Sequence, residues 1–263
     1  MGDNLFQFSL FCADPDLAKK AALAKIDMLI IDWECSHKKA RQKGYDTEIN
    51  RHTVSDLRRV ASAVDIPVIC RINPFGDETQ SEIAAAIENG AFEILMPMVR
   101  TLEEVETVLG WVKGKCKVSI LIETLSAVQL TAQLSALPLS RIYVGLNDLH
   151  IEMREKNLFS PLANGLLEKI RNQVTLPFGF GGLTLPHLGS PIPCQLLIDE
   201  MARLKCSFSF LRRSFLKDVP VEKFADAIVQ IRSAYAKAKK RKVEQIALSH
   251  EELLNKVRSY ATG

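Results

Sequence analysis

Charged side chains directly follow several short apolar runs of this sequence. Asp32 and Glu34 end one run, Arg71 ends the next, and Glu123 and Asp148 follow two later ones. A charge beside a buried strand costs free energy unless it is paired or binds a ligand. Two carboxylates can share a hard cation such as Mg²⁺ or Mn²⁺, with water and substrate oxygens completing the octahedron. We therefore predict that Glu123 and Asp148 bind a divalent metal ion. An ion pair with a lysine or arginine is the alternative for each carboxylate.

Arg71 and its neighbours at the strand ends form a second group of candidates. The fixed fork of a guanidinium suits planar anions, so Arg71 could clamp a carboxylate or stabilise an enolate oxygen. A structural salt bridge to Asp32 or Glu34 is the alternative, and both roles can hold at once. We predict catalytic roles for Arg71 and Glu34. Glu34 would either orient a metal-bound water or support the residues that contact the metal and the substrate. Asp32, Asn73 and Asn147 are predicted to contact the substrate.

Glycines and arginines follow the last two apolar runs. Gly181 and Gly182 stand after one run, and Arg212 and Arg213 stand after the other. Backbone N–H groups exposed by glycines, together with two arginines, suit a phosphorylated or otherwise anionic substrate. These four residues are predicted to bind such a substrate. A tight turn beside surface arginines is the alternative.

Eight short apolar runs, separated by amphipathic stretches, must position these side chains. Most of the runs are continuously apolar, which is typical of parallel strands covered by helices. The runs span residues 5–12, 28–32, 67–71, 93–98, 117–122, 141–145, 177–181 and 207–211. Eight strands alternating with helices predict an α/β fold, the (β/α)₈ TIM barrel, whose active site lies at the carboxyl ends of the strands. An open doubly wound sheet is the alternative, but residues 13–16 lack its usual glycine-rich first turn.

The chain is predicted to divide into a catalytic barrel and a tail. The barrel domain spans residues 1–236, and a C-terminal helical extension, basic and then amphipathic, spans residues 237–263. Within the barrel, Thr79 with Glu82 and Thr101 with Glu104 have the spacing of a capping box, which predicts two helix starts.

The composition indicates an ordinary globular protein. The chain has 263 residues, of which 25% are charged, and a net charge of +3. The basic run at 237–242 is interpreted as a solvated helix end, with a nucleic-acid or membrane patch as the alternative, so no nucleic-acid partner is predicted. Six cysteines without C-x-x-C spacing indicate a reducing compartment, no disulfides and no zinc site. We find neither a signal peptide nor an apolar run near the ~20 residues that span a membrane. A cytoplasmic location without a membrane partner is therefore predicted.

Five short motifs in a fixed order carry a family resemblance. They are Asp32-Trp33-Glu34, Arg71-Ile72-Asn73, Leu95-Met96-Pro97-Met98-Val99, Ile122-Glu123-Thr124 and Gly145-Leu146-Asn147-Asp148-Leu149. The set resembles the HpcH/HpaI aldolase and citrate lyase β-subunit family. The resemblance implies a metal-dependent barrel that makes or breaks a carbon–carbon bond beside a 2-oxo acid, such as pyruvate, or an acyl thioester.

The resemblance also implies roles for individual residues. Glu123 and Asp148 match the metal ligands, which would hold Mg²⁺ or Mn²⁺, and Arg71 matches the arginine that faces the substrate oxyanion. Asp32 and Glu34 match acidic residues near the metal. The substrate would be a small 2-oxo acid or related carboxylate, and the protein would form a homo-oligomer, a trimer or a hexamer.

One departure from the family pattern concerns the general base. Cys35 stands where aldolases of the family have a histidine and citrate-lyase-like members have an acidic residue. His37, two residues later, is the catalytic base predicted to substitute, and an exposed residue without a role is the alternative. Three functions thus stay open: an aldolase or lyase acting on a 2-oxo acid, a lyase or synthase acting on an acyl thioester, and a barrel that lost its base and serves as a binding or regulatory protein.

Overall fold

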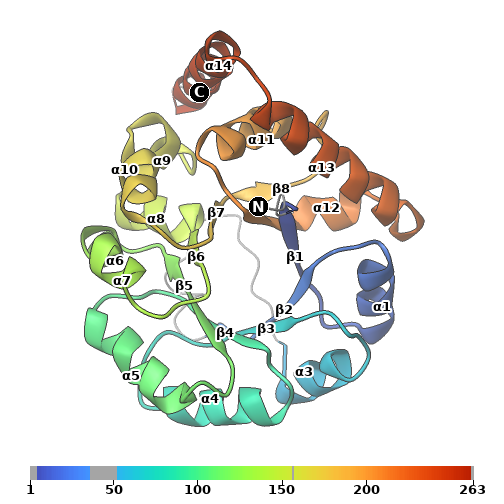
Figure 1. Cartoon of the computed structure of the whole chain (residues 1–263), viewed down its shortest axis with the longest axis vertical. Coiled ribbons are helices and arrows are strands. Elements are labelled where there is room, and N and C mark those ends of the chain that lie inside the picture. Colours follow the sequence, from blue (N-terminus) through green and yellow to red (C-terminus); the bar gives the residue numbers. More distant parts are fainter. Residues whose placement is uncertain (1–4, 36–51, 156, 262–263) are drawn as a thin grey trace.

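The strands form one parallel sheet that curves into an almost closed barrel. The structure is a computed structural model that describes residues 5–35, 52–155 and 157–261. The strands are β1 (Gln7–Phe11), β2 (Met28–Asp32), β3 (Val68–Arg71), β4 (Glu93–Met96), β5 (Lys117–Ile122), β6 (Ile142–Val144), β7 (Phe178–Phe180), β8 (Gly182–Leu183) and β9 (Phe208–Leu211). Their order in the sheet is β7-β6-β5-β4-β3-β2-β1-β9-β8, and Figure 1 looks into the barrel they enclose. The predicted α/β barrel is confirmed.

The barrel closes between β7 and β9. The backbone N–H of Ser207 donates to the carbonyl oxygen of Phe178 over 2.9 Å, and the Ser209 hydroxyl donates to the carbonyl of Phe180 over 3.2 Å. The short strand β8 was not predicted. It follows Gly181, whose φ of 60° interrupts the run, a conformation that glycine adopts without steric cost. The eight predicted strands therefore correspond to β1–β7 and β9, and β8 continues the seventh beyond this break.

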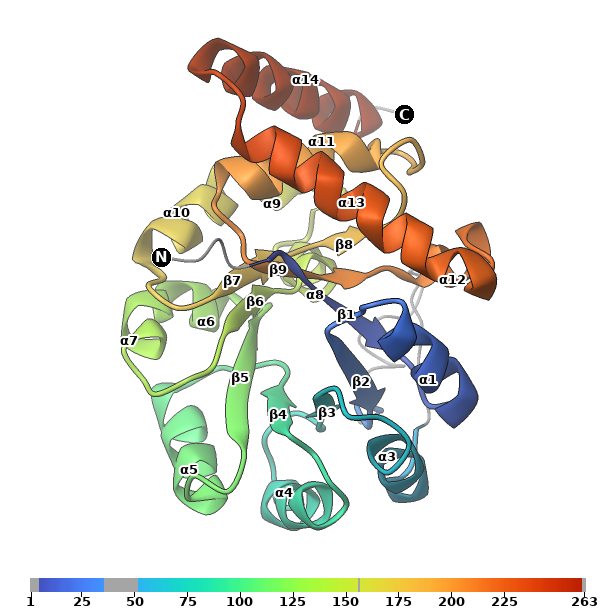
Figure 2. The same cartoon turned by 45° about the vertical axis from the view of Figure 1, so that its right-hand side comes forward.

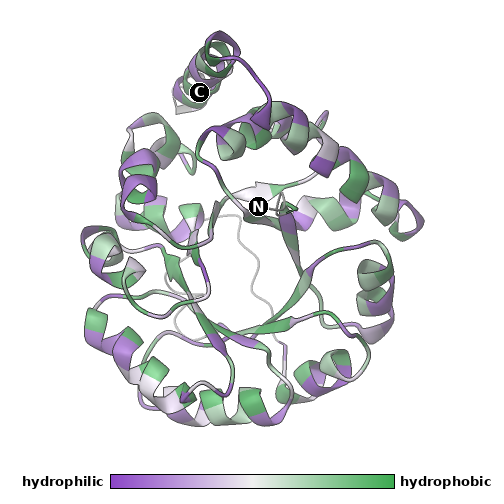
Figure 3. Cartoon of the chain, viewed as in Figure 1, coloured by the Kyte–Doolittle hydropathy of each residue, from purple (hydrophilic) through white to green (hydrophobic). Residues whose placement is uncertain are grey.

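Helices surround the strands as an outer layer (Figure 1). They are α1 (Pro15–Leu23), α3 (Val54–Ala61), α4 (Thr79–Glu88), α5 (Leu102–Val112), α6 (Leu125–Gln129), α7 (Thr131–Ser135), α8 (Leu146–Glu152), α9 (Ser160–Ala163), α10 (Leu166–Gln173), α11 (Cys194–Arg203), α12 (Arg213–Asp218), η1 (Val221–Lys223), α13 (Phe224–Lys239) and α14 (Val243–Ala261). Figure 3 shows apolar and polar residues alternating along these helices, as expected where one face packs on the sheet.

One of the two predicted capping boxes is present. Thr101 and Glu104 form both hydrogen bonds of the box at the start of α5. The prediction for Thr79 and Glu82 is wrong, because α4 begins after Glu78 without a side-chain cap. Glu82 instead accepts hydrogen bonds from Asn73, a residue at the end of β3.

The inside of the barrel holds its own apolar cluster. This cluster consists of Met28, Ile30, Ile69, Leu95, Leu121, Tyr143 and Phe208, with Phe11 and Phe210 packed against it. Side chains alternate between the two faces of a strand, so every second residue points inward. Asp32, Arg71 and Glu123 each stand two positions beyond a member of this cluster. They therefore continue the inward rows at the carboxyl ends of β2, β3 and β5.

The C-terminal extension packs on the outer layer. In Figure 2, α14 lies outside α11 and α13. Leu253 and Val257 of α14 are buried, and α14 contacts α11. Arg241, between α13 and α14, forms an ion pair with Asp199 of α11 over 3.0 Å. No helix in the described part of the chain has both the length and the apolar character needed to cross a bilayer.

Candidate active site

Asp32, Glu34 and Arg71 form one buried network at the ends of β2 and β3. Arg71 donates from Nε and Nη2 to the two carboxylate oxygens of Asp32 over 2.8 and 2.7 Å. Its Nη1 lies 3.3 Å from Glu34 Oε2. The strand register explains the fork, since Asp32 and Arg71 are partners in the pairing of β2 with β3. Both predicted salt bridges of Arg71 are therefore present.

The network keeps Arg71 charged inside the protein. Burial alone would lower the pKa of Arg71, but the carboxylates of Asp32 and Glu34 outweigh burial and raise this pKa. The guanidinium also lies over the ring of Phe11, with 5.0 Å from its central carbon to the ring centroid. A cation held by a bidentate pair and an aromatic face keeps a fixed plane, as recognition of a planar anion requires.

Glu123 is held at the end of β5 by two backbone features that the sequence did not indicate. The backbone N–H of Met98 donates to Glu123 Oε1 over 2.8 Å. On the other side, a Cβ at Gly145 would clash with Glu123 Oε2, so only glycine leaves room for this carboxylate. The side chain is 3% exposed, and its oxygens are therefore held in place almost without water.

Asp148 shares the environment of Glu123. It lies in the first turn of α8 and is also buried. Burial raises the pKa of Glu123, and the nearby charges of Asp148 and Glu34 raise it further, against the opposing effects of Arg71 and the Met98 N–H. A divalent cation between these carboxylates would offset their repulsion.

The donor set fits a hard cation. Buried carboxylate oxygens are the ligands that Mg²⁺ and Mn²⁺ take, and Mg²⁺ usually needs only one or two protein carboxylates. In the described ranges, no three His, Cys, Asp or Glu side chains gather in a cluster that could hold a metal. Glu123 and Asp148 are the pair of described carboxylates that could hold such an ion.

The polar residues predicted beside this core have differing surroundings. Asn73 accepts a hydrogen bond from the backbone N–H of Cys35 over 3.0 Å and donates to Glu82. It thus ties the loop after β2 to α4. Asn147 is half-buried in α8, next to Asp148. His37 lies outside the described residues.

His52 is a residue that the sequence did not single out. Its Nδ1 accepts the backbone N–H of Asp32 over 3.0 Å. That ring nitrogen is therefore unprotonated, and in the neutral ring the proton sits on Nε2. His52 supports the backbone where β2 ends. No signal in the sequence marks it, because the contact joins residues 20 positions apart.

The glycines and arginines predicted to bind an anion lie around β8. A Cβ at Gly181 would lie 3.9 Å from Leu146 Cδ1, so this turn adjoins the start of α8. A Cβ at Gly182 would lie 2.7 Å from the Cβ of Arg212, which shows how closely the two segments pack. Arg212 is half-buried, whereas Arg213 is exposed as the first residue of α12.

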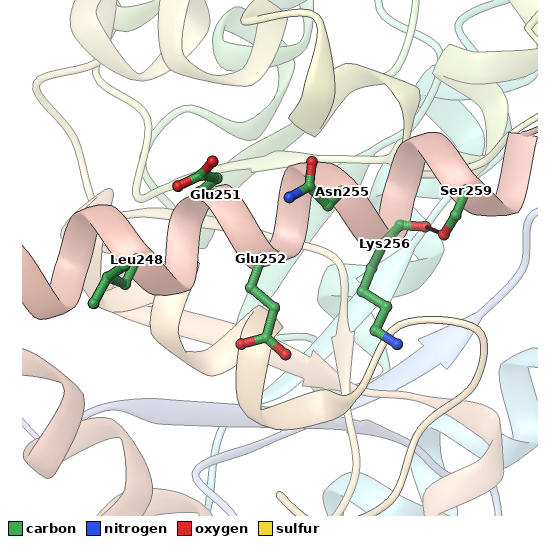
Figure 4. Close-up of a pocket in the computed structure, with 6 residues that line it drawn as sticks. All are labelled: Leu248, Glu251, Glu252, Asn255, Lys256 and Ser259. Carbon is green, nitrogen blue, oxygen red and sulfur yellow. Dashed lines mark hydrogen bonds between the residues drawn. The ribbon is translucent and has the colours of Figure 1, made fainter.

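The pocket drawn in Figure 4 lies elsewhere. The residues that line it all belong to α14: Leu248, Glu251, Glu252, Asn255, Lys256 and Ser259. This helix lies outside the ring of helices (Figure 1). The buried charges, by contrast, gather where barrel enzymes carry their active sites. We therefore take the strand ends as the candidate active site.

The fold and this site define a parallel α/β barrel with buried carboxylates at its carboxyl end. The family model HpcH/HpaI aldolase/citrate lyase matches residues 7–174, which is well over half of the chain. The chain therefore belongs to the HpcH/HpaI aldolase/citrate lyase family, and the predicted resemblance is confirmed. Its function class is that of a lyase or aldolase.

Solved structures share the fold at low sequence identity. An HpcH/HpaI aldolase from Desulfitobacterium hafniense is 13% identical, with a TM-score of 0.61 over 82% of this chain and 89% of that one. A citrate lyase from Burkholderia xenovorans is 13% identical, with a TM-score of 0.58 over 97% and 83%. RipC from Yersinia pestis is 14% identical, with a TM-score of 0.57 over 91% and 97%. The comparison with curated proteins found no match.

Proposed function

We propose that this protein is a divalent-metal-dependent carbon–carbon lyase or aldolase acting on a 2-oxo acid such as pyruvate. The observation that carries the proposal is the buried pair of Glu123 and Asp148 at the strand ends, where burial first and then the charge of Asp148 raise the pKa of Glu123. Mg²⁺ or Mn²⁺ held by this pair would polarise the carbonyl group of the substrate. We also propose that the protein is located in the cytoplasm.

Arg71 supplies positive charge where the reaction develops negative charge. Cleavage of the carbon–carbon bond of a 4-hydroxy-2-oxo acid removes the hydroxyl proton and leaves the electron pair on an enolate, while an aldehyde departs. A guanidinium fixed by Asp32 through Nε and Nη2 does not reorganise as that charge appears, and such preorganisation stabilises the transition state. Asp32 acts here by holding Arg71.

Glu34 is a candidate for the general base among the residues that the structure describes. Its carboxylate is 1% exposed and lies 3.3 Å from Arg71 Nη1, at the edge of the same site. A base must come within hydrogen-bond reach of the proton it takes. We propose Glu34 in this role or as the residue that orients a water, with His37 as the other candidate.

Proton exchange at the methyl group of pyruvate tests the proposal. Protein, pyruvate and Mg²⁺ or Mn²⁺ are incubated in D₂O, and loss of the methyl signal is followed by NMR. We expect exchange that depends on the metal and that Glu123→Gln abolishes. The control is Glu168→Gln, the same change at a carboxylate 47% exposed on the surface, which should leave the exchange rate unchanged.

The two ways of failing have different meanings. Exchange that persists in Glu123→Gln would show that Glu123 is not a metal ligand. No exchange by the wild-type protein under any metal would contradict a pyruvate enolate and would favour the acyl-thioester reading or that of a binding protein.

A further inference from the structure

Arg212 is half-buried and has no counter-ion among the residues that the structure describes. Among the residues that the structure describes, no group accepts a hydrogen bond from its Nε, although that atom is buried. No carboxylate of the described chain forms an ion pair with its guanidinium, in contrast to Arg71, Arg141, Arg203, Arg232 and Arg241. Leaving such a group unpaired costs free energy, so an unpaired buried donor calls for a ligand.

Two glycines make room for this side chain. A Cβ at Gly182 would lie 2.7 Å from Arg212 Cβ, and a Cβ at Gly189 would lie 2.9 Å from Arg212 Nη2. Gly189 also has a φ of 112°, which an L side chain rarely adopts. The guanidinium thus lies close to the backbone of Gly189, in the loop that leads from β8 to α11.

An acidic residue of α12 binds two hydroxyl groups of the chain. Asp218 accepts hydrogen bonds from the hydroxyls of Thr184 and Ser214 through the same oxygen, over 2.7 and 2.8 Å. Its carboxylate thereby braces the segment after β8 against α12. Among the described residues, Asp218 forms no ion pair with Arg212.

Strand β9, which Arg212 follows, reaches the candidate active site through aromatic contacts. Phe210, two residues earlier in β9, packs edge to face on Phe11 with ring centroids 5.6 Å apart. Phe11 in turn lies under the guanidinium of Arg71. Since every second residue of a strand points to the same face, Arg212 continues the inward row of Phe208 and Phe210 beyond the end of β9.

We propose that Arg212 binds an anionic group, a phosphate or a carboxylate, at the far end of the second substrate. The role as a subsite rests on the proposed function, whereas the binding of an anion does not. A guanidinium forms paired hydrogen bonds with the oxygens of either group. Arg212 would therefore set the preference for an anionic over a neutral aldehyde.

Titration with inorganic phosphate tests the binding site without any turnover. Line broadening of the ³¹P signal gives the dissociation constant for the wild type and for the variants. We expect Arg212→Met to weaken phosphate binding at least tenfold, because it removes a charge-assisted contact. Arg212→Lys should recover part of the loss. Lys217→Met removes a nearby exposed charge and should bind phosphate like the wild type.

Equal affinities of wild type and Arg212→Met, or no binding by the wild type, would overturn the inference. Circular dichroism of each variant shows whether it is folded, and Arg212→Gln gives a second neutral variant should Arg212→Met not fold. Acetate is titrated in the same way, and its dissociation constant is compared with that of phosphate. Tighter binding of acetate would indicate a carboxylate site, and tighter binding of phosphate would indicate a phosphate site. Loss of pyruvate exchange together with intact phosphate binding would refute the proposed function and leave the anion site standing.

Discussion

The neighbours of Arg71 fix the orientation of its guanidinium group. The two oxygens of Asp32 fix its plane, Glu34 lies at Nη1, and the ring of Phe11 covers one face. A lysine has neither the plane nor the paired donors, so the network would lose its geometry even if the charge remained.

We expect Arg71→Lys to lower kcat by about 100-fold or more, the range seen when one donor to an oxyanion is removed. Metal binding should be much less affected, because Arg71 does not contribute a ligand. Steady-state kinetics and Mn²⁺ titration measure the two effects. Arg59→Lys, at a surface pair with Asp56, is the control. Unchanged kinetics in Arg71→Lys would make this arginine a purely structural residue.

Gly145 positions Glu123 by having no side chain. We expect Gly145→Ala to push the carboxylate aside and to lower activity by about 100-fold, the effect of misplacing a catalytic group by about an ångström. Affinity for Mn²⁺ should fall with it. Gly110→Ala is the matched control, since a Cβ there meets nothing within 4 Å and an alanine favours the helix. Wild-type metal affinity in Gly145→Ala would contradict the packing argument.

At the scale of elements, every strand except β8 was recognisable from its apolar run, and most of these runs are continuous. Where the predicted strand ends differ from the observed ones, they differ by one or two residues, since a strand ends where its pairing ends. The predicted run 93–98, for example, stops as β4 at Met96. Met98 then adopts a φ of 53°, which turns its N–H toward Glu123. The capping box at Thr79 failed for a similar reason, because Asn73 from another segment takes up Glu82.

The C-terminal helix α14 is expected to be part of the cooperative fold. Leu253 is fully buried in its packing, so Leu253→Ala should lower the free energy of unfolding by about 2–4 kcal/mol. Leu23→Ala makes the same change at a side chain 79% exposed on α1 and should cost under about 0.5 kcal/mol. Urea unfolding followed by circular dichroism measures both. Equal values would mean that α14 does not contribute to stability.

On the scale of the whole molecule, large apolar side chains remain exposed on the two C-terminal helices. Val229 of α13 is 63% exposed, and Val243, Leu248 and Tyr260 of α14 are 78%, 67% and 50% exposed. Burying such side chains against a second copy would stabilise an assembly by roughly 25 cal/mol per Å² of apolar area.

We expect a homo-oligomer of three or six copies of the 29.4 kDa chain. Light scattering coupled to size-exclusion chromatography gives the mass directly. Val229→Lys together with Leu248→Lys would place charges in the apolar faces of α13 and α14 and should shift the mass toward a single chain. A wild-type protein that elutes with the mass of one chain would contradict the expectation.

The order and composition of the chain determined by themselves the barrel, the family and the residues at the strand ends. Continuous apolar runs and the polar residue that ends each run are local signals, and parallel strands bring their carboxyl ends to one side whatever the details. Asp32, Arg71 and Glu123 could therefore be named without coordinates.

Only the tertiary structure decided what holds these residues in place. The contacts of Glu123 with Met98 and Gly145, and of Asp32 with His52, join segments 20 or more positions apart. They depend on the register of neighbouring strands and on single backbone angles. The same holds for Arg212. Its residue type suggested that it binds an anion, but only the packed structure shows that its buried Nε has no acceptor among the described residues. Local periodicity determines which side chains point inward, and the distances between those side chains arise only when the barrel closes.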